Sequence, residues 1–149
     1  QASFIPAFFP EGVEAGVDYD FFYFPAYSTK DLGKPVLGGG TLFAATNDNE
    51  ATMEFLKFLL HPEPNEWWMA KGGFLTPNKN ADLSKYSSDT FRKLGEVLTN
   101  ATTFRFDGSD LMPGAIGAGS FWTGMVDYTN GKSAKDVADS IQASWDAIK

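Results

Sequence analysis

Two carboxylates, Asp107 and Asp110, have the residue type and the spacing that hydrolytic chemistry uses. Glycosidases place two carboxyl groups a few ångströms apart, one as the acid and the other as the base or nucleophile. The same Asp-Gly-Ser-Asp string is also ordinary turn and helix-capping sequence, because short polar side chains hydrogen-bond the backbone two residues on. We expect the turn, and the catalytic pair is the alternative.

The remaining polar residues do not add a catalytic or metal-binding set. His61 is the single histidine, and it stands at a predicted helix end, where a cation suits the helix dipole. The chain has no cysteine, so disulfides and thiolate metal sites are excluded. The three glycines at 38–40 lack the spacing of a phosphate-binding loop and its lysine. The sequence therefore indicates no catalytic residues, no metal and no cofactor.

The aromatic residues favour carbohydrate binding. Sugars present apolar C–H faces that stack on rings, and hydroxyls that need planar polar partners. Trp122 fits best, because it follows the glycine-rich stretch 114–120, where missing side chains let a ligand approach the backbone. Arg105 lies between two phenylalanines, and a guanidinium in apolar sequence needs a partner. Core packing is the alternative for Trp122. Packing on helical faces is the preferred interpretation for three other tryptophans: Trp67, Trp68 and Trp145.

The composition describes an ordered, acidic chain. Of its 149 residues, 43% are hydrophobic and 15% aromatic, which excludes a disordered chain and predicts a well-packed core. The formal net charge of -7 disfavours binding to nucleic acid and to anionic membranes. No apolar run approaches the roughly 20 residues that a membrane span needs.

The elements that would position these residues are strands early in the chain and helices later. Segments rich in β-forming or apolar residues predict extended structure over 17–24, 41–46 and 101–106. Capping residues, apolar spacing and Gly or Pro stops predict five helices, over about 50–60, 65–71, 88–99, 116–129 and 134–149. We see no internal repeat and no linker, so the prediction is a mixed α/β fold with its helices concentrated late.

Several short motifs follow one another in a specific order. An aromatic strand closed by Pro comes first, followed by a Gly-rich turn and a capped helix. The run Trp-Met-Ala-Lys-Gly-Gly-Phe-Leu-Thr-Pro-Asn-Lys comes next, and after it a Met-Pro…Phe-Trp segment and a terminal Gly-Lys-Ser-Ala-x-Asp-Val helix. This order resembles the C-terminal part of extracellular solute-binding proteins of carbohydrate ABC importers, the family that includes maltose-binding protein. Residues 9–12, 31–35 and 100–110 are closer still to periplasmic α-glucoside-binding proteins.

The resemblance implies a type II periplasmic-binding-protein fold, in which two α/β lobes close on a sugar and then dock on membrane permease subunits. Residues 1–149 would form most of one lobe, and the N-terminal lobe would be absent, since Gln1 begins inside apolar sequence without an initiator Met. Such a fragment is expected to dimerise through the surface that the other lobe covers. The implied location is the periplasm or the cell envelope, either free or lipid-anchored.

The implied function is non-catalytic capture of an α-glucoside or related oligosaccharide, with trehalose, sucrose, maltose and longer oligomers left open. Met112 and Trp122 match a pair in the family with the same interval, in which the Met lines the cleft and the Trp stacks on a glucosyl ring. Three residues match the turn that enters the cleft, where backbone amides meet sugar hydroxyls: Gly39, Gly40 and Thr41. Arg105 matches a region that often supplies a charged contact. A glycosidase fragment and a protein-interaction module are the alternatives.

Overall fold

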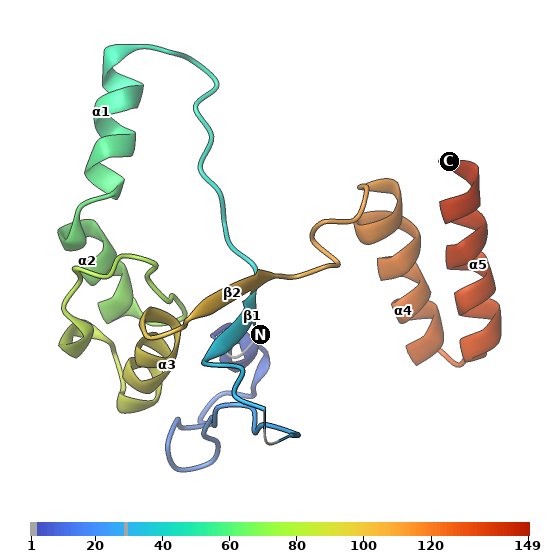
Figure 1. Ribbon diagram of the computed structural model, residues 1–149, viewed down its shortest axis with the longest axis horizontal. Helices are drawn as coiled ribbons and strands as arrows, with labels where there is room; N and C mark the ends of the chain where they lie inside the picture. The colour runs from blue at the N-terminus through green and yellow to red at the C-terminus, as the bar shows by residue number, and fades with distance from the viewer. Residues whose placement is uncertain (1–2, 29) are drawn as a thin grey trace. The chain divides into compact units, whose positions relative to one another are not determined.

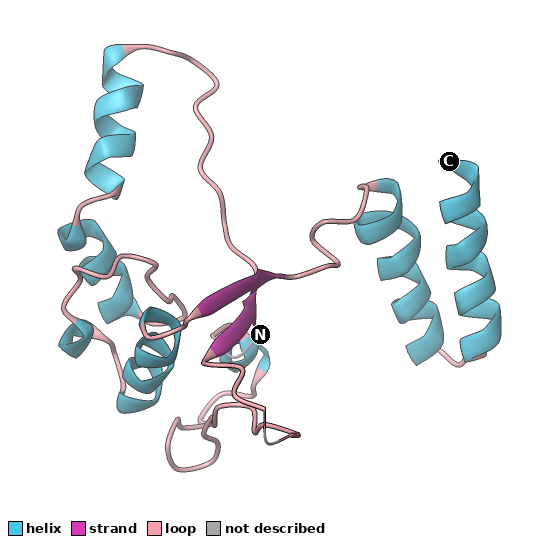
Figure 2. Cartoon of the chain, in the orientation of Figure 1, coloured by secondary structure: helices cyan, strands magenta, loops and turns pink. Residues whose placement is uncertain are grey.

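The computed structural model describes residues 3–28 and 30–149, so the observation on Gln1 lies outside the described residues. The chain forms two compact units, Gln1–Arg105 and Phe106–Lys149. Helices dominate both units, and the sheet is small (Figure 2). This helix-rich chain with a small sheet is consistent with the predicted partial α/β lobe. Within the described ranges, no helix combines the length and the apolar character that crossing a membrane requires.

The sheet of the first unit has two strands, β1 (Pro35–Gly38) and β2 (Thr103–Phe106), which lie side by side (Figure 1). Thr102 links their ends, because its N–H donates to the Lys34 carbonyl oxygen at 3.0 Å and its Oγ1 accepts from the Lys34 N–H at 2.8 Å. The predicted extension over 101–106 is thereby confirmed in β2.

The other two strand predictions are wrong. Residues 17–24 form loops, with one isolated bridge between Ala15 and Tyr19, and residues 41–46 are an exposed loop. Preceding them, η1 (Ile5–Phe8) is a short 3-10 helix. Strand propensity reflects packing against a neighbouring strand, and these segments find none among the described residues, so their β-forming composition does not decide their structure.

Helix α1 (Glu50–Leu59) begins where the sequence predicts, and Asn49 caps it, because its Oδ1 accepts from the Thr52 N–H at 2.9 Å. None of its residues is buried, and Phe55 is 55% exposed. Its ring contact with the next helix runs from Phe58 to Trp67, with centroids 6.0 Å apart. The composition predicted a well-packed core, and this apolar helix face remains open to solvent instead.

The core of the first unit lies among α2 (Pro62–Lys71), η2 (Leu83–Lys85) and α3 (Asp89–Thr99). Helix α2 begins at Pro62 rather than near 65, because a proline at the first helical position lacks an N–H that would be unpaired there anyway. The cap of α3, which the sequence leaves between Ser87 and Ser88, is Ser88, whose Oγ accepts the Phe91 N–H at 3.2 Å. The buried apolar side chains here are Met69, Ala81, Tyr86 and Phe91.

A polar network ties the loop after α2 to this core. Thr76 is fully buried, and its Oγ1 donates to Asn65 Oδ1 at 2.8 Å and accepts from the Asn78 N–H at 3.0 Å. The Thr76 N–H donates to the Tyr86 hydroxyl at 3.0 Å, and Asn78 Nδ2 donates to the Leu60 carbonyl at 2.8 Å. Burial raises the pKa of Tyr86, and the hydrogen bond from Thr76 opposes that rise. The loop is therefore fixed by paired polar groups.

The second unit contains η3 (Ala115–Phe121), α4 (Trp122–Thr129) and α5 (Ala134–Ala147). Helices α4 and α5 pack closely because Gly124 has no side chain: a Cβ there would lie 3.0 Å from Val137 Cγ1 and 3.1 Å from Ile141 Cδ1. Ser133 caps α5 as predicted, accepting the Asp136 N–H at 3.1 Å and donating to Asp136 Oδ2 at 2.7 Å.

The continuous helix predicted over 116–129 is divided. Its first part, η3, is a π-helix, and Gly119 within it has non-helical angles of φ -90° and ψ -105°. Glycine disfavours the regular α-helix, so tertiary contacts can select a wider helix in this glycine-rich segment. This division falls directly before Trp122.

Candidate functional site

Two of the six predicted sugar-binding residues, Trp122 and Met112, lie in the second unit. Trp122 is the first residue of α4, and its side chain is 68% exposed. Its backbone N–H donates to the Gly119 carbonyl oxygen, which also accepts from Thr123 Oγ1 at 2.5 Å. The kinked glycine thus anchors the turn that carries the indole, and the indole is accessible to a ligand.

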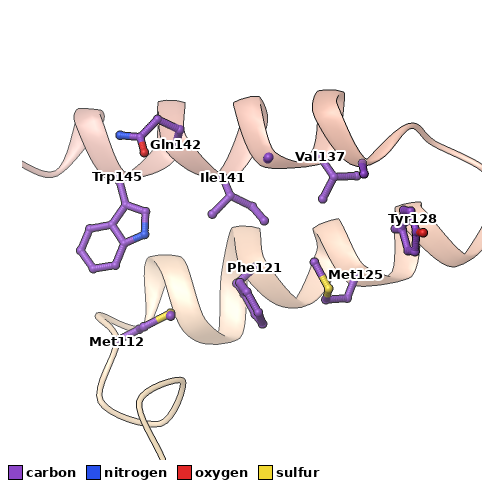
Figure 3. A pocket seen from close by; sticks show the side chains of 10 residues that line it. Met112, Phe121, Met125, Tyr128, Val137, Ile141, Gln142 and Trp145 are labelled. Atoms are coloured by element: carbon purple, nitrogen blue, oxygen red, sulfur yellow. The ribbon is translucent and has the colours of Figure 1, made fainter.

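A groove of about 490 Å³ lies along α4 and α5, and Figure 3 shows Val137, Ile141 and Trp145 extending from α5 toward α4. Ten residues line it: Met112, Phe121, Met125, Tyr128, Ala134, Val137, Ala138, Ile141, Gln142 and Trp145. Met112 belongs to this set, whereas Trp122 does not.

The groove contains an aromatic residue that sequence reasoning did not select. Trp145 was assigned to packing on a helical face, and it lines the groove with Phe121 and Met112. Its i, i+4 spacing from Ile141 was the available signal, since that spacing places both on one helix face. Gln142 supplies an amide at the same groove, and its Nε2 donates to Asp146 Oδ1 at 3.0 Å. The lining is thus mainly apolar with a polar margin.

The other four predicted residues lie in the first unit, at its small sheet. Gly39, Gly40 and Thr41 form an exposed loop directly after β1, and a Cβ on Gly40 would meet no atom within 4 Å. Arg105 is exposed in β2. The strands meet closely, because a Cβ on Gly38 would lie 3.1 Å from the Phe104 ring. The six residues thus fall into two groups, one in each unit.

Asp107 forms the turn that the sequence predicts. Its Oδ1 accepts from the Ser109 N–H at 2.9 Å and from Ser109 Oγ at 2.8 Å. These bonds from Ser109, side chain first, hold the pKa of Asp107 below its ordinary value. A lowered pKa does not suit the acid of a glycosidase pair, whereas it is compatible with the ionised partner. The two local hydrogen bonds from Ser109 are those of a turn, and this geometry favours the turn over the catalytic pair with Asp110.

The glycine-rich stretch before Trp122 is tightly packed at one point. A Cβ on Gly117 would lie 2.8 Å from the Ser109 carbonyl oxygen. At this glycine the neighbouring backbone, and not a ligand, occupies the space left by the missing side chain. The Ser120 hydroxyl is buried and has no hydrogen-bond partner among the described residues. Nor do those residues hold three or more metal-ligating side chains in one group.

Comparison with known proteins yields two curated relatives. No protein-family model and no solved structure matches the chain. It is 59% identical over 150 residues, covering 100% of this chain and 33% of the relative, to the Alpha-glucosides-binding periplasmic protein AglE of Rhizobium meliloti. It is 39% identical over 145 residues, 97% of this chain and 34% of the relative, to the Osmoprotective compounds-binding protein GgtB of Synechocystis. The chain spans about a third of the length of these relatives. The predicted resemblance to periplasmic α-glucoside-binding proteins is confirmed.

Proposed function

We propose that the chain is part of the substrate-binding component of an ABC transporter, which captures α-glucosides or related oligosaccharides and delivers them to the membrane permease. The observation that carries this proposal is 59% identity over the whole chain with a protein named for binding α-glucosides in the periplasm. The same likeness supports a periplasmic location. Trehalose, sucrose, maltose and longer α-glucosides are the ligands in question.

The proposed binding residues follow the two groups in the structure. Trp122 stacks on a glucosyl ring and Met112 contacts the sugar beside it. Gly39, Gly40 and Thr41 offer backbone amides, and Arg105 offers a guanidinium that suits paired hydroxyls. The 68% exposure of Trp122 supports this role, because a stacking platform must be reachable. Stacking contributes about 0.5–1.5 kcal/mol beyond area burial, by analogy with aromatic pairs.

The proposal extends to the surroundings of the chain. Residues 1–149 contribute to one lobe, and a further lobe supplies the rest of the cleft. The apolar face of α1 and the residue that caps its end support a covering partner, since Phe55 and Leu60 are 55% and 77% exposed. In the absence of that partner, the chain dimerises through such surfaces. Light scattering after size exclusion tests this, and a monomer at all concentrations contradicts it.

The proposed role is binding without catalysis. Both relatives are named as binding proteins. Asp107 Oδ1 is also engaged in a local turn by both hydrogen bonds from Ser109, which disfavours the glycosidase alternative. Incubating the full-length gene product with a nitrophenyl α-glucoside should release no colour, whereas steady release would favour the enzyme.

The relative from Synechocystis favours a second ligand class, osmoprotective compounds. At 39% identity it is the more distant of the two relatives, so α-glucosides come first. Trehalose and sucrose belong to both classes and are therefore informative ligands. Binding of these two but not of maltose would place the protein nearer the osmoprotectant binders.

Titration calorimetry of the full-length gene product with maltose, trehalose and sucrose tests the proposal. Trp122→Ala should weaken binding by about 2- to 13-fold through lost stacking alone, and further through lost contact area. Trp67→Ala is the matched control, since Trp67 is a similarly exposed tryptophan outside the proposed site, and it should leave affinity unchanged. Absence of heat with all three sugars, or full affinity in Trp122→Ala, would overturn the proposed site.

A further inference from the structure

The turn closed by Asp107 touches η3, the helix that precedes Trp122. The two hydrogen bonds from Ser109 to Asp107 Oδ1, at 2.9 Å and 2.8 Å, fix the backbone of residue 109. The Ser109 carbonyl oxygen then accepts the Met112 N–H at 3.3 Å. The same oxygen stands 2.8 Å from where a Cβ on Gly117 would be. One carboxylate therefore sets the position of a carbonyl that contacts both Met112 and η3.

The contact at Gly117 involves Met112 as well. A Cβ on Gly117 would lie 3.2 Å from Met112 Cβ and 3.8 Å from the Met112 carbonyl oxygen. The Gly117 N–H donates to the Pro113 carbonyl oxygen at 2.9 Å, which closes the first turn of η3. The turn, Met112 and the start of η3 thus form one closely packed piece.

This packed piece leads into Trp122 through a kink at Gly119, since η3 ends at Phe121 and α4 begins at Trp122. The intervening residues are not a relaxed α-helix: Gly119 has non-helical angles, and the buried Ser120 hydroxyl lacks a described partner. Wide helical turns and unpaired buried polar groups are retained mainly where function requires a particular geometry. The direction of the indole therefore depends on the contact at the start of η3.

The packing of α4 against α5 has its own contact away from this turn, although Met112 and Phe121 also lie beside α5. It rests on Gly124 against Val137 and Ile141. Loss of the Asp107 carboxylate should therefore release the turn and shift Met112 and Trp122 while the helix pair stays folded.

We infer that Asp107 is a positioning residue of the sugar site: it holds Met112 and Trp122 in place through Ser109 and Gly117, without touching the ligand. The inference rests on the proposed function. The first unit provides a matched turn, because Asp82 Oδ1 accepts the Ser84 N–H at 2.9 Å in the same Asp-x-Ser pattern. The two turns differ in their neighbours, so they separate a site effect from a general turn effect.

The test compares four variants of the full-length gene product by calorimetry with maltose, trehalose and sucrose. Asp107→Ala should weaken binding by about 2- to 30-fold, the range for residues that act through others. Asp107→Asn should bind within about 2-fold of the natural protein, because an amide oxygen still accepts both bonds. Asp82→Ala should leave affinity unchanged. Ser109→Ala removes one of the two donors, so it should give a smaller loss in the same direction as Asp107→Ala.

A double-mutant cycle with Trp122→Ala distinguishes positioning from general damage. If Asp107 acts through Trp122, the two losses are not additive. Full affinity in Asp107→Ala, or additive losses, would overturn the inference. An equal loss in Asp107→Asn would also overturn it, since that result indicates direct contact between the carboxylate and the sugar.

Failure of the proposed function is a distinct outcome, in which the natural protein binds none of the three sugars. The inference is then tested by tryptophan fluorescence. The emission of Trp122 is obtained as the difference between the spectrum of a protein that has Trp122 and the spectrum of the same protein with Trp122→Phe. That difference should shift in Asp107→Ala and stay unchanged in Asp107→Asn. An identical difference spectrum in Asp107→Ala would reject the positioning role on its own. Should Asp107→Ala fail to fold, Ser109→Ala takes its place in both measurements.

Discussion

The core around α2 and α3 and the glycine-rich helix η3 both contain a glycine that leaves room for a neighbouring group, but their buried polar groups differ in hydrogen bonding. In the first region, Gly95 accommodates the Tyr86 ring, and the buried Thr76 hydroxyl is both a donor and an acceptor. In the second region, Gly117 accommodates a carbonyl oxygen, and the buried Ser120 hydroxyl has no described partner. Satisfied polar groups stabilise, and an unsatisfied one costs free energy.

This difference separates a region built for stability from one shaped by another requirement. Native proteins pair nearly all buried polar groups, so an exception needs an explanation, and functional sites are where exceptions gather. The two regions should therefore respond in opposite ways to the same type of substitution.

The largest expected effect is at Gly95 in the first region. A Cβ there would lie 2.4 Å from Tyr86 Cε2 and 2.9 Å from Cζ, and an aromatic ring cannot bend away. Gly95→Ala should lower the free energy of unfolding by about 2–3 kcal/mol, despite the better helix propensity of alanine. Urea unfolding followed by circular dichroism measures this. Gly114→Ala is the control, because Gly114 has helical angles and open space around it, and its stability should change little.

The next largest effect is at Thr76. Thr76→Val keeps the shape of the side chain but leaves Asn65 Oδ1 and the Asn78 N–H without their partner. The expected cost is about 1–3 kcal/mol, the desolvation penalty of buried groups that lose their hydrogen bonds. Thr76→Ser retains the hydroxyl and should keep the network. If the serine variant were the less stable of the two, packing of the methyl group and not the polar network would fix the loop.

At Ser120 the same type of change should have the opposite sign. Ser120→Ala removes a buried hydroxyl with no described partner, so the chain should be unchanged or more stable by up to about 1 kcal/mol. Stability loss comparable to that of Thr76→Val would show that the hydroxyl is paired in solution. The contrast between the two regions would then disappear.

The helices were the more predictable part of the fold, because their signals are local. Asn49, Ser88 and Ser133 cap helices at the predicted places, and each cap is a hydrogen bond to a residue three positions on. The strands over 17–24 and 41–46 were predicted from composition and do not form. A strand requires a partner from a distant part of the chain, and composition carries no information on that partner.

Only those features of the site that follow from residue type or from family resemblance were predictable from the sequence. The exposure of Trp122 and the turn at Asp107 agree with the residue types, whereas the roles of the six predicted residues in binding remain predictions. The contact at Gly117 depends on how η3 packs against the preceding turn, and the groove position of Trp145 depends on how α5 packs beside Met112 and Phe121. A glycine gives no sign in sequence of whether a ligand or the chain fills the space beside it.

The smallest expected effect is the pH dependence of the two turns closed by Asp82 and Asp107, one in each region. Bonds from Ser84 lower the pKa of Asp82, and bonds from Ser109 lower that of Asp107, both relative to the ordinary 3.8. A carboxyl with a lowered folded-state pKa contributes stability that is complete above its unfolded pKa and is lost as pH falls through the folded pKa. Both turns should therefore be constant near neutral pH and weaken only below about pH 4.

Asparagine at either position keeps an acceptor but no longer titrates, so each variant should remove the contribution of one carboxyl group from a pH profile. For Asp82→Asn this is a small part of the loss of helical circular dichroism below about pH 4, to which other carboxyl groups such as Asp20 also contribute. For Asp107→Asn it is the sugar affinity of the full-length gene product over the same range, with the helical signal unchanged. A change in either profile near neutral pH would require another titrating group, since both carboxylates are fully ionised there. If Asp82→Asn altered the affinity profile as Asp107→Asn does, the two turns would not act independently. The contrast between a stabilising region and a proposed binding region would then fail.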